Sequence, residues 1–266
     1  MENPFIQKLR HSNALTEADL RTLERCLGPL RPISAGTDIV VEGDRPGTCL
    51  VLMEGLVGRY KQLRNGRRQI LSFQVPGDFI DMHSFVLGRL DHSMAALSDC
   101  RIAPVSHASM QEILGEHPRI SLAFLRESMI EAAVFRDWVV NLGQRAGYGR
   151  LAHAFCELAC RLKAVGQMHG NSFHFPVTQE ELGQAVGLSA VHVNRVMQRL
   201  KAHGLVTHQA GVLTIHDWQG LQRAGDFEPS HLFLGGEGGQ LSADGAPIRP
   251  SRTGGEDAAP NPPHRG

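Results

Sequence analysis

Residues 178–189 read Thr178-Gln179-Glu180-Glu181-Leu182-Gly183-Gln184-Ala185-Val186-Gly187-Leu188-Ser189, and the fold can be worked out from this stretch. Thr178 and Glu181 have capping-box spacing, which predicts that a short helix begins there. Gly187 is placed to end that helix, and Ser189 is placed to cap a second one. Two short helices joined by a tight turn that contains Gly predict a helix-turn-helix.

The residues that follow complete a DNA-binding pattern. Runs at 205–207 and 212–215, on either side of Gln209-Ala210-Gly211, predict a two-stranded wing. The first turns of the second helix would meet base edges in a major groove, where Arg pairs with guanine and Asn with adenine. The candidate base readers are Ala190, Val191, His192, Asn194 and Arg195. The candidate phosphate partners are Thr178 and Ser189 at the helix N-termini, Arg199, Lys201, His203 and His208. A winged helix that serves only protein contacts is the alternative.

The amino-terminal half has a different period. Between residues 37 and 105, short apolar runs alternate with turns such as Asn65-Gly66, a strong hairpin signal because both positions favour positive φ. This pattern predicts a compact antiparallel barrel or jelly roll.

A long helix is predicted at about residues 118–143, with apolar residues on two sides. Leu122, Leu125, Met129 and Ala132 form one stripe; Phe124, Phe135, Trp138 and Leu142 form the other. A helix that is apolar on two faces needs two surfaces to bury them. The barrel can cover one face, and a second copy of the helix can cover the other. A helix buried within its own domain remains open as the alternative.

Composition narrows the class of protein. The 266 residues carry 27 Lys and Arg against 27 Asp and Glu, but residues 144–220 hold seven basic against four acidic residues, which favours an anionic partner there. The sequence contains no apolar run long enough for a membrane span, no secretory signal and no disulfide framework, so we expect a cytoplasmic protein without a membrane partner. Phosphate-loop, HExxH and Gly-x-Ser-x-Gly motifs are absent from the sequence, so we expect no enzyme and no catalytic residues.

Taken together, these motifs resemble the Crp/Fnr family of bacterial transcriptional regulators. The resemblance also rests on Ala35-Gly36-Thr37, Glu42-Gly43-Asp44, Glu54-Gly55, Pro76-Gly77-Asp78, Gly149-Arg150-Leu151-Ala152, Val193-Asn194-Arg195 and Gly204-Leu205-Val206. It implies an α+β fold with an antiparallel, cyclic-nucleotide-binding-like β-roll at 1–118 and a dimerisation helix at 119–143. A winged helix-turn-helix follows at 144–220, and 221–266 are expected to be a disordered tail.

The resemblance further implies a homodimer that binds a two-fold symmetric operator in double-stranded DNA, with RNA polymerase as a partner. A signal in the β-roll or long helix would reorient the recognition helices through a hinge at residues 143–149. A ligand-sensing or protein-interaction module whose winged helix no longer binds DNA is the rival class.

The departures from the family concern the effector. Where cyclic-nucleotide binders place a phosphate-clamping Arg, this chain has His92, followed by Ser93, and Asp78 could stand for their ribose-binding acid. An imidazole beside Asp91 is a poor substitute for a guanidinium, so we do not expect cyclic AMP binding. Asp78, His92 and Ser93 are then β-roll surface or a pocket for another effector.

Other cofactors find little support in the sequence. Only Cys26 lies near the amino terminus, which does not suit an iron–sulfur cluster. His83, His92 and His107 carry no feature that singles out a haem ligand. His153, Cys156 and Cys160 share a helix face and are interpreted as core, so no metal ligand is assigned.

Many relatives have Glu at the position of Val191, so we expect an operator that differs at the base pair facing Val191.

Overall fold

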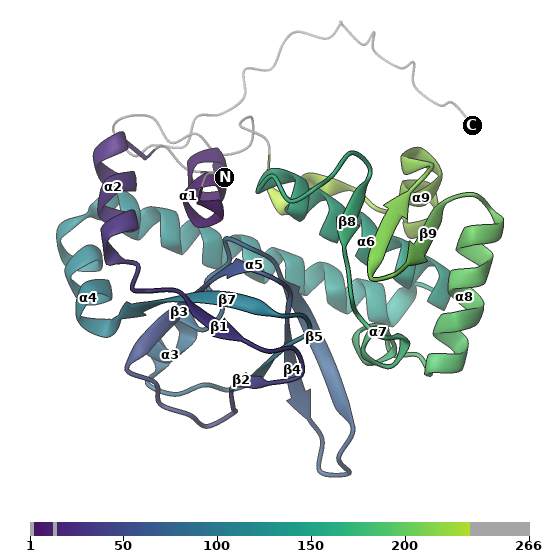
Figure 1. The fold of residues 1–266 in the computed structure, drawn as a ribbon, viewed down its shortest axis with the longest axis horizontal. Coiled ribbons are helices and arrows are strands. Elements are labelled where there is room, and N and C mark those ends of the chain that lie inside the picture. Colours follow the sequence, from purple (N-terminus) through teal and green to yellow (C-terminus); the bar gives the residue numbers. More distant parts are fainter. Residues whose placement is uncertain (1–2, 13–14, 235–266) are drawn as a thin grey trace, which may run out of the picture.

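The computed structural model describes residues 3–12 and 15–234, and Figure 1 shows two lobes joined along a long helix. The amino-terminal lobe holds two antiparallel sheets packed face to face. Their strand orders are β1-β7-β3 and β2-β6-β4-β5. The strands are β1 (Arg31–Ile33), β2 (Asp38–Val40), β3 (Thr48–Glu54), β4 (Val57–Gln62), β5 (Arg68–Gln74), β6 (Ser93–Ala96) and β7 (Cys100–Ser106). The antiparallel roll predicted from the period-two pattern is confirmed.

The Asn65-Gly66 hairpin lies between β4 and β5. Its connection is longer than the two-residue turn that the dipeptide suggests, because pairing ends at Gln62 with Arg68. Only Gly66 adopts positive φ (79°), while the Asn65 side chain accepts a hydrogen bond from the Arg67 amide. The hairpin is therefore confirmed with a different turn.

Four helices cover the roll. They are α1 (Pro4–Ser12), α2 (Glu17–Cys26), α3 (Met82–Leu87) and α4 (His107–Glu116). Thr16 begins α2 with a complete capping box to Asp19. Phe5, Leu23, Val51 and Met110 pack in one core cluster, so α1, α2 and α4 are held by apolar contact with the roll.

The long helix α5 (Pro118–Gln144) is followed, after Arg145 and Ala146, by α6 (Gly147–Ala164). The two apolar stripes of α5 differ in solvent exposure. Phe124 and Trp138 are 3% exposed and pack inward, whereas Leu125 and Met129 are 56% and 57% exposed. One face of the helix is thus part of the core and the other is uncovered in the single chain.

The carboxyl-terminal lobe contains α6, α7 (Gln179–Val186), α8 (Ala190–Ala202) and α9 (Trp218–Gly225) around a sheet of order β8-β10-β9. The predicted wing is confirmed as β9 (Val206–Gln209) and β10 (Val212–Ile215), and β8 (Ser172–His174) adds a third strand. A short 3₁₀ helix, η1 (Pro229–Leu232), follows and packs against α5 and α6.

The prediction that a disordered tail begins at residue 221 is wrong for the first part of that segment. Residues 221–234 are structured, because α9 runs to Gly225 and η1 follows it. Leu221, Phe227 and Leu232 are each at most 5% exposed and join the core of the carboxyl-terminal lobe. Averaging composition over the whole segment concealed these three buried positions at its start. Residues 235–266 lie outside the described part of the chain.

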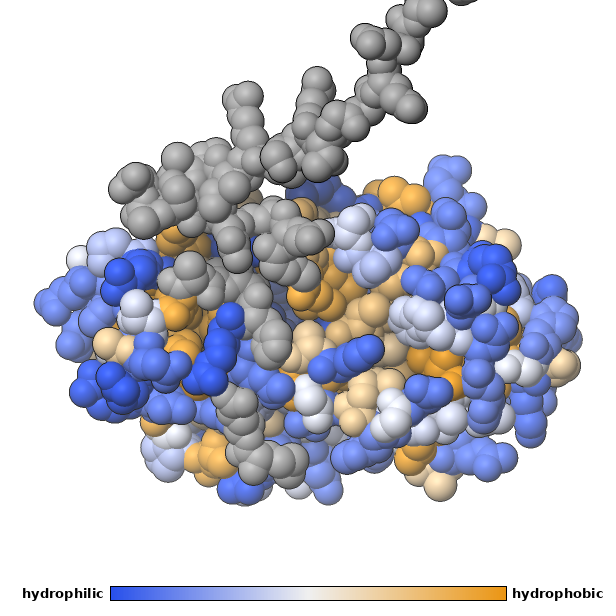
Figure 2. Space-filling model, turned by 90° about the horizontal axis from the view of Figure 1, so that it is seen from above, coloured by the Kyte–Doolittle hydropathy of each residue, from blue (hydrophilic) through white to orange (hydrophobic). Residues whose placement is uncertain are grey.

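The surface of the described residues is mixed in character. Figure 2 shows one face on which hydrophobic side chains gather near the middle and hydrophilic ones dominate the ends. Among the described helices, none is long and apolar enough to cross a bilayer.

Candidate nucleic-acid interface and the polar centre of the β-roll

Capping hydrogen bonds and two glycines determine the local geometry of the helix-turn-helix. The Thr178 hydroxyl accepts a hydrogen bond from the Glu181 amide at 3.2 Å, and the Glu181 carboxylate accepts one from the Thr178 amide at 2.8 Å. Gly187 ends α7 with φ of 69°. A Cβ on Gly183 would lie 2.4 Å from the Leu188 carbonyl oxygen, so the turn crosses α7 closely enough to require glycine.

The outer face of α8 carries the predicted base readers. Val193, Val196 and Leu200 are at most 2% exposed and fix the helix on the lobe. All five candidates are exposed together at the start of the helix: Ala190, Val191, His192, Asn194 and Arg195. Gln198 is also exposed, one turn beyond Asn194, and only its helical spacing marked it in the sequence.

Arg199 and Lys201 occupy the basic last turn of α8. The Arg199 guanidinium lies over the Tyr148 ring, 4.9 Å from its centroid, and the Tyr148 hydroxyl contacts His203 Nδ1 at 2.7 Å. This cluster links α8 to the start of α6 and orients Arg199. Tyr148 was not predicted as part of the interface.

The remaining phosphate candidates are partly engaged inside the protein. The side chains of Thr178 and Ser189 cap α7 and α8, so any anion there would meet backbone amides. Glu180 and Glu181 lie in the first turn of α7, which disfavours an anion at that terminus. His208 Nε2 contacts the Phe175 carbonyl at 2.7 Å within the wing, apart from the exposed face of α8.

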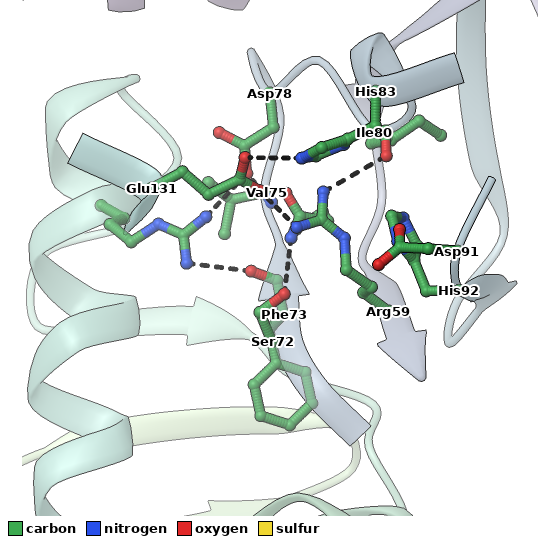
Figure 3. A network of polar contacts seen from close by, with 12 residues as sticks. Arg59, Ser72, Phe73, Val75, Asp78, Ile80, His83, Asp91, His92 and Glu131 are labelled. Atoms are coloured by element: carbon green, nitrogen blue, oxygen red, sulfur yellow. Dashed lines mark hydrogen bonds and ion pairs between the residues drawn. The ribbon is translucent and has the colours of Figure 1, made fainter. Parts of the chain in front are cut away.

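A second polar group lies inside the amino-terminal lobe, and we call Arg59, Asp81, His83, His92 and Glu131 the β-roll polar centre. Arg59 is 2% exposed, and its Nη1 contacts Glu131 Oε1 of α5 at 2.5 Å. Figure 3 shows the guanidinium between Glu131 on one side and His92 on the other. His83 Nε2 lies 3.6 Å from the second Glu131 oxygen. The centre therefore joins the roll to the long helix, and no motif marks Arg59 in the sequence.

Asp78, His92 and Ser93 are all buried, so the interpretation of them as roll surface is wrong. The Asp78 carboxylate contacts Lys8 Nζ at 2.8 Å and Arg161 Nη2 at 2.7 Å. His92 Nδ1 contacts Asp91 at 2.6 Å, and the Ser93 hydroxyl accepts from the Glu42 amide. Asp78 lines a cavity of about 100 Å³ beside α5, whereas His92 and Ser93 are outside its lining. The three residues do not form one pocket.

Burial controls ionisation in the β-roll polar centre. Desolvation raises the pKa of Asp81 to about 7 and lowers the pKa of His92 to about 4. It also lowers the pKa of His83. Asp78 differs: burial alone would raise its pKa, but Lys8 and Arg161 outweigh burial and hold the pKa below its ordinary value. Near neutral pH the histidines are therefore uncharged, and the Arg59 charge is matched by Glu131.

Comparisons with known proteins agree with this architecture. A family model described as a cyclic nucleotide-binding domain matches residues 30–117, and one described as a Crp-like helix-turn-helix domain matches residues 149–224. The nitrogen fixation regulation protein FixK of Bradyrhizobium diazoefficiens is 27% identical over 205 residues, covering 77% of this chain and 85% of that protein. The transcriptional activator protein FnrL of Cereibacter sphaeroides is 24% identical over 206 residues, covering 74% and 81%.

Solved structures show the same fold. FixK2 from Bradyrhizobium japonicum superposes with a TM-score of 0.65 at 21% identity, covering 74% of this chain and 96% of that one. The c-di-GMP responsive global regulator CLP of Xanthomonas campestris superposes with a TM-score of 0.60 at 18% identity, covering 76% and 100%.

A cyclic-nucleotide-binding-type roll, a long helix and a Crp-like winged helix define a DNA-binding transcriptional regulator. The chain belongs to the Crp/Fnr family of these regulators, as its sequence motifs suggested.

Proposed function

We propose that this regulator binds a two-fold symmetric operator as a homodimer, reads it through the exposed face of α8, and controls transcription initiation without cyclic AMP. The observation that carries the proposal is the exposure of Val191, Asn194 and Arg195 at the start of α8, ahead of its basic last turn. A helix presented in this way fits a major groove, with base contacts at its start and phosphate contacts near its end.

The uncovered stripe of α5 supports the dimer. Leu122, Leu125 and Met129 are 43–57% exposed, and the partly buried Ala132 extends the same alternating three- and four-residue spacing. Arg136 occupies the next position of this series, and Val139 follows it. This spacing is that of a coiled-coil seam, and a contiguous exposed apolar stripe marks an interaction surface. A second copy of α5 would bury the stripe and place two α8 helices on one side of a duplex.

The residues present do not fit a cyclic nucleotide. His92 replaces the phosphate-clamping Arg, is buried, and has its Nδ1 engaged by Asp91. Asp78 is occupied by Lys8 and Arg161, so its carboxylate is not available to a ribose hydroxyl. The buried Arg59 is paired with Glu131, which leaves little uncompensated positive charge in the β-roll polar centre for a phosphate.

RNA polymerase is the second partner in this proposal, as the family membership implies. The two residues between α5 and α6 are the joint about which the winged helix would turn when a signal reaches the roll or the long helix. Asp78 and Arg161 connect the roll directly to α6, which offers a second route for such a signal.

DNA-site selection followed by a salt series tests the proposal. The chain should enrich a two-fold repeated half-site that differs from the usual family half-site at the base pair facing Val191. Affinity for the selected site should fall steeply and linearly with log salt concentration, because bound phosphates release counterions. Failure to enrich any site, with no salt-dependent retention of duplex DNA, would favour an interaction module instead.

A further inference from the structure

Three potential metal ligands converge where α5, α6 and η1 meet. Asp137 of α5, His153 of α6 and His231 of η1 each direct one ligand atom into a region where these atoms lie within 4.8 Å of one another. The residues are far apart in the sequence, and two of them are on opposite sides of the joint between α5 and α6. Tertiary packing alone therefore creates the cluster.

The converging atoms lack hydrogen-bond partners within the described part of the chain. They are Asp137 Oδ2, His153 Nε2 and His231 Nε2. His153 is 1% exposed, and its Nε2 is 2.5 Å from Asp137 Oδ2 without the geometry of a hydrogen bond. Buried polar atoms that lack partners are rare because desolvation makes them costly. Two atoms with lone pairs at this distance repel unless a proton or a cation lies between them.

The opposite nitrogen of each imidazole is already engaged. His153 Nδ1 is 3.2 Å from the Gly225 carbonyl oxygen, and His231 Nδ1 is 2.8 Å from the Glu228 carbonyl oxygen. A carbonyl can only accept, so each Nδ1 carries the hydrogen and a neutral ring presents its lone pair at Nε2. Histidines that bind metals are oriented in the same way by a hydrogen bond at the other nitrogen.

We propose that Asp137, His153 and His231 bind a divalent transition metal ion of the Zn²⁺ type, with water completing the coordination. Two imidazoles and one carboxylate suit zinc and its neighbours better than Mg²⁺ or Ca²⁺, which prefer oxygen ligands. Ligand bonds of about 2.0–2.2 Å require small side-chain rotations that bring His231 closer and separate Asp137 from His153.

Arg145 is a positively charged residue beside the site. Its Nη1 lies 3.8 Å from Asp137 Oδ2, and its Nη2 donates to the Asp226 carbonyl at 3.0 Å. Because this ion pair involves Oδ2, a metal bound at Oδ2 would require Arg145 to shift toward the second carboxylate oxygen of Asp137. Cys156 and Cys160, which share the α6 face with His153 in the sequence pattern, are not members of the cluster.

A bound ion would restrain the joint between the two lobes. It would connect α5 to α6 across Arg145 and Ala146, and both helices to η1. Metal binding should therefore raise the unfolding temperature of the carboxyl-terminal lobe, since a ligand that binds only the folded state stabilises it. This expectation does not depend on DNA binding.

Metal titration of the untagged full chain tests the proposal. After treatment with chelator and its removal, the protein should bind one equivalent of Zn²⁺ by calorimetry, and Co²⁺ should give visible absorption bands of a protein-bound ion. His231→Gln and Asp137→Asn should each weaken binding at least tenfold. His169→Gln, at an exposed histidine in the loop after α6, is the matched control and should bind like the unaltered chain.

The thermal shift gives a second readout that separates metal binding from misfolding. Zn²⁺ should raise the unfolding temperature of the unaltered chain and of His169→Gln, but not that of His231→Gln, whose far-ultraviolet circular dichroism should remain unchanged. The proposal is overturned if the unaltered chain shows no saturable equivalent, or if folded His231→Gln binds zinc as tightly as the control.

Discussion

Arg195 and Lys201 both project from exposed positions of α8, but at different points along the helix. Arg195 is near its start, where a guanidinium can meet two acceptors of guanine. We expect Arg195→Ala to weaken binding to the selected operator by about 1–3 kcal/mol with little change on random DNA. Lys201→Ala should weaken binding to both DNAs alike. Fluorescence anisotropy measures both, and equal loss of specificity in the two variants would contradict the assigned roles.

Asp81 makes the stability of the roll depend on pH. Burial raises its pKa from 3.8 to about 7, although its Oδ1 accepts a hydrogen bond from the Leu50 amide. Between these values the folded state retains a proton that the unfolded chain has lost, so the carboxyl's contribution to the free energy of unfolding falls as pH rises. Asp81→Asn cannot ionise and keeps an oxygen for Leu50. Its stability relative to the unaltered chain should therefore increase from about pH 4 to about pH 7 and then level off.

Denaturant unfolding of both proteins across this range measures the difference. His92, whose pKa burial lowers to about 4, acts in the opposite direction, because the unfolded chain binds the extra proton there. Because His92 is present in both proteins, its contribution to the pH dependence of the free energy of unfolding largely cancels in the difference between them. A pH-independent difference between the two proteins would show that Asp81 ionises normally.

At the scale of elements, the turn between α7 and α8 depends on glycine. Because a Cβ on Gly183 would meet the Leu188 carbonyl oxygen, Gly183→Ala should force α7 and the turn apart. We expect destabilisation by about 1–3 kcal/mol, typical of overpacking, and weaker operator binding. Gly115→Ala in α4 is the control, since a Cβ there has no neighbour within 4 Å and should be neutral or stabilising. Thermal unfolding compares them, and equal behaviour would contradict the close crossing.

The two faces of α5 illustrate what an element's pattern can and cannot indicate. Its apolar periodicity correctly indicated two stripes, and the structure shows that the stripe with Phe124 and Trp138 is buried. The stripe with Leu125 and Met129 is exposed in the single chain, so the periodicity alone does not identify the surface that covers it.

At the scale of the whole molecule, the exposed stripe of α5 predicts the oligomeric state. Met129→Glu places a charge in the centre of the proposed seam, while its 57% exposure means that the single chain should still fold. We expect the variant to sediment as a monomer and to bind the two-fold operator much more weakly. Gln144→Glu, exposed at the end of α5, is the matched control and should remain dimeric. An unchanged sedimentation coefficient for Met129→Glu would exclude this stripe as the interface.

The two lobes are also joined outside α5. Gln69 of β5 donates to the Ala185 carbonyl of α7 at 3.1 Å, and Arg161 of α6 donates to the Phe73 carbonyl of β5 at 2.9 Å. The winged helix therefore rests directly on the roll in this arrangement. Any turn at the joint between α5 and α6 has to break or move these contacts.

The sequence alone determined the features that depend on residues a few positions apart. The capping box of Thr178 and Glu181, the turn at Gly187 and the hairpin at Asn65-Gly66 are local interactions, so their spacing in the chain reveals them. Hydrophobic periodicity likewise indicated the strands of the roll and the helices α5 and α8, because burial of one face imposes the period of the element.

Only the tertiary structure decided how distant polar residues combine. Asp78 pairs with Lys8 and Arg161, which lie 70 and 83 positions away, and Arg59 pairs with Glu131 at a separation of 72. His231 joins Asp137 and His153 only because Leu232 and its neighbours fold back onto the core. Neither hydrophobic periodicity nor the spacing of a local motif predicts such pairings. They arise when packing removes charged and polar groups from water and leaves them a small set of possible partners.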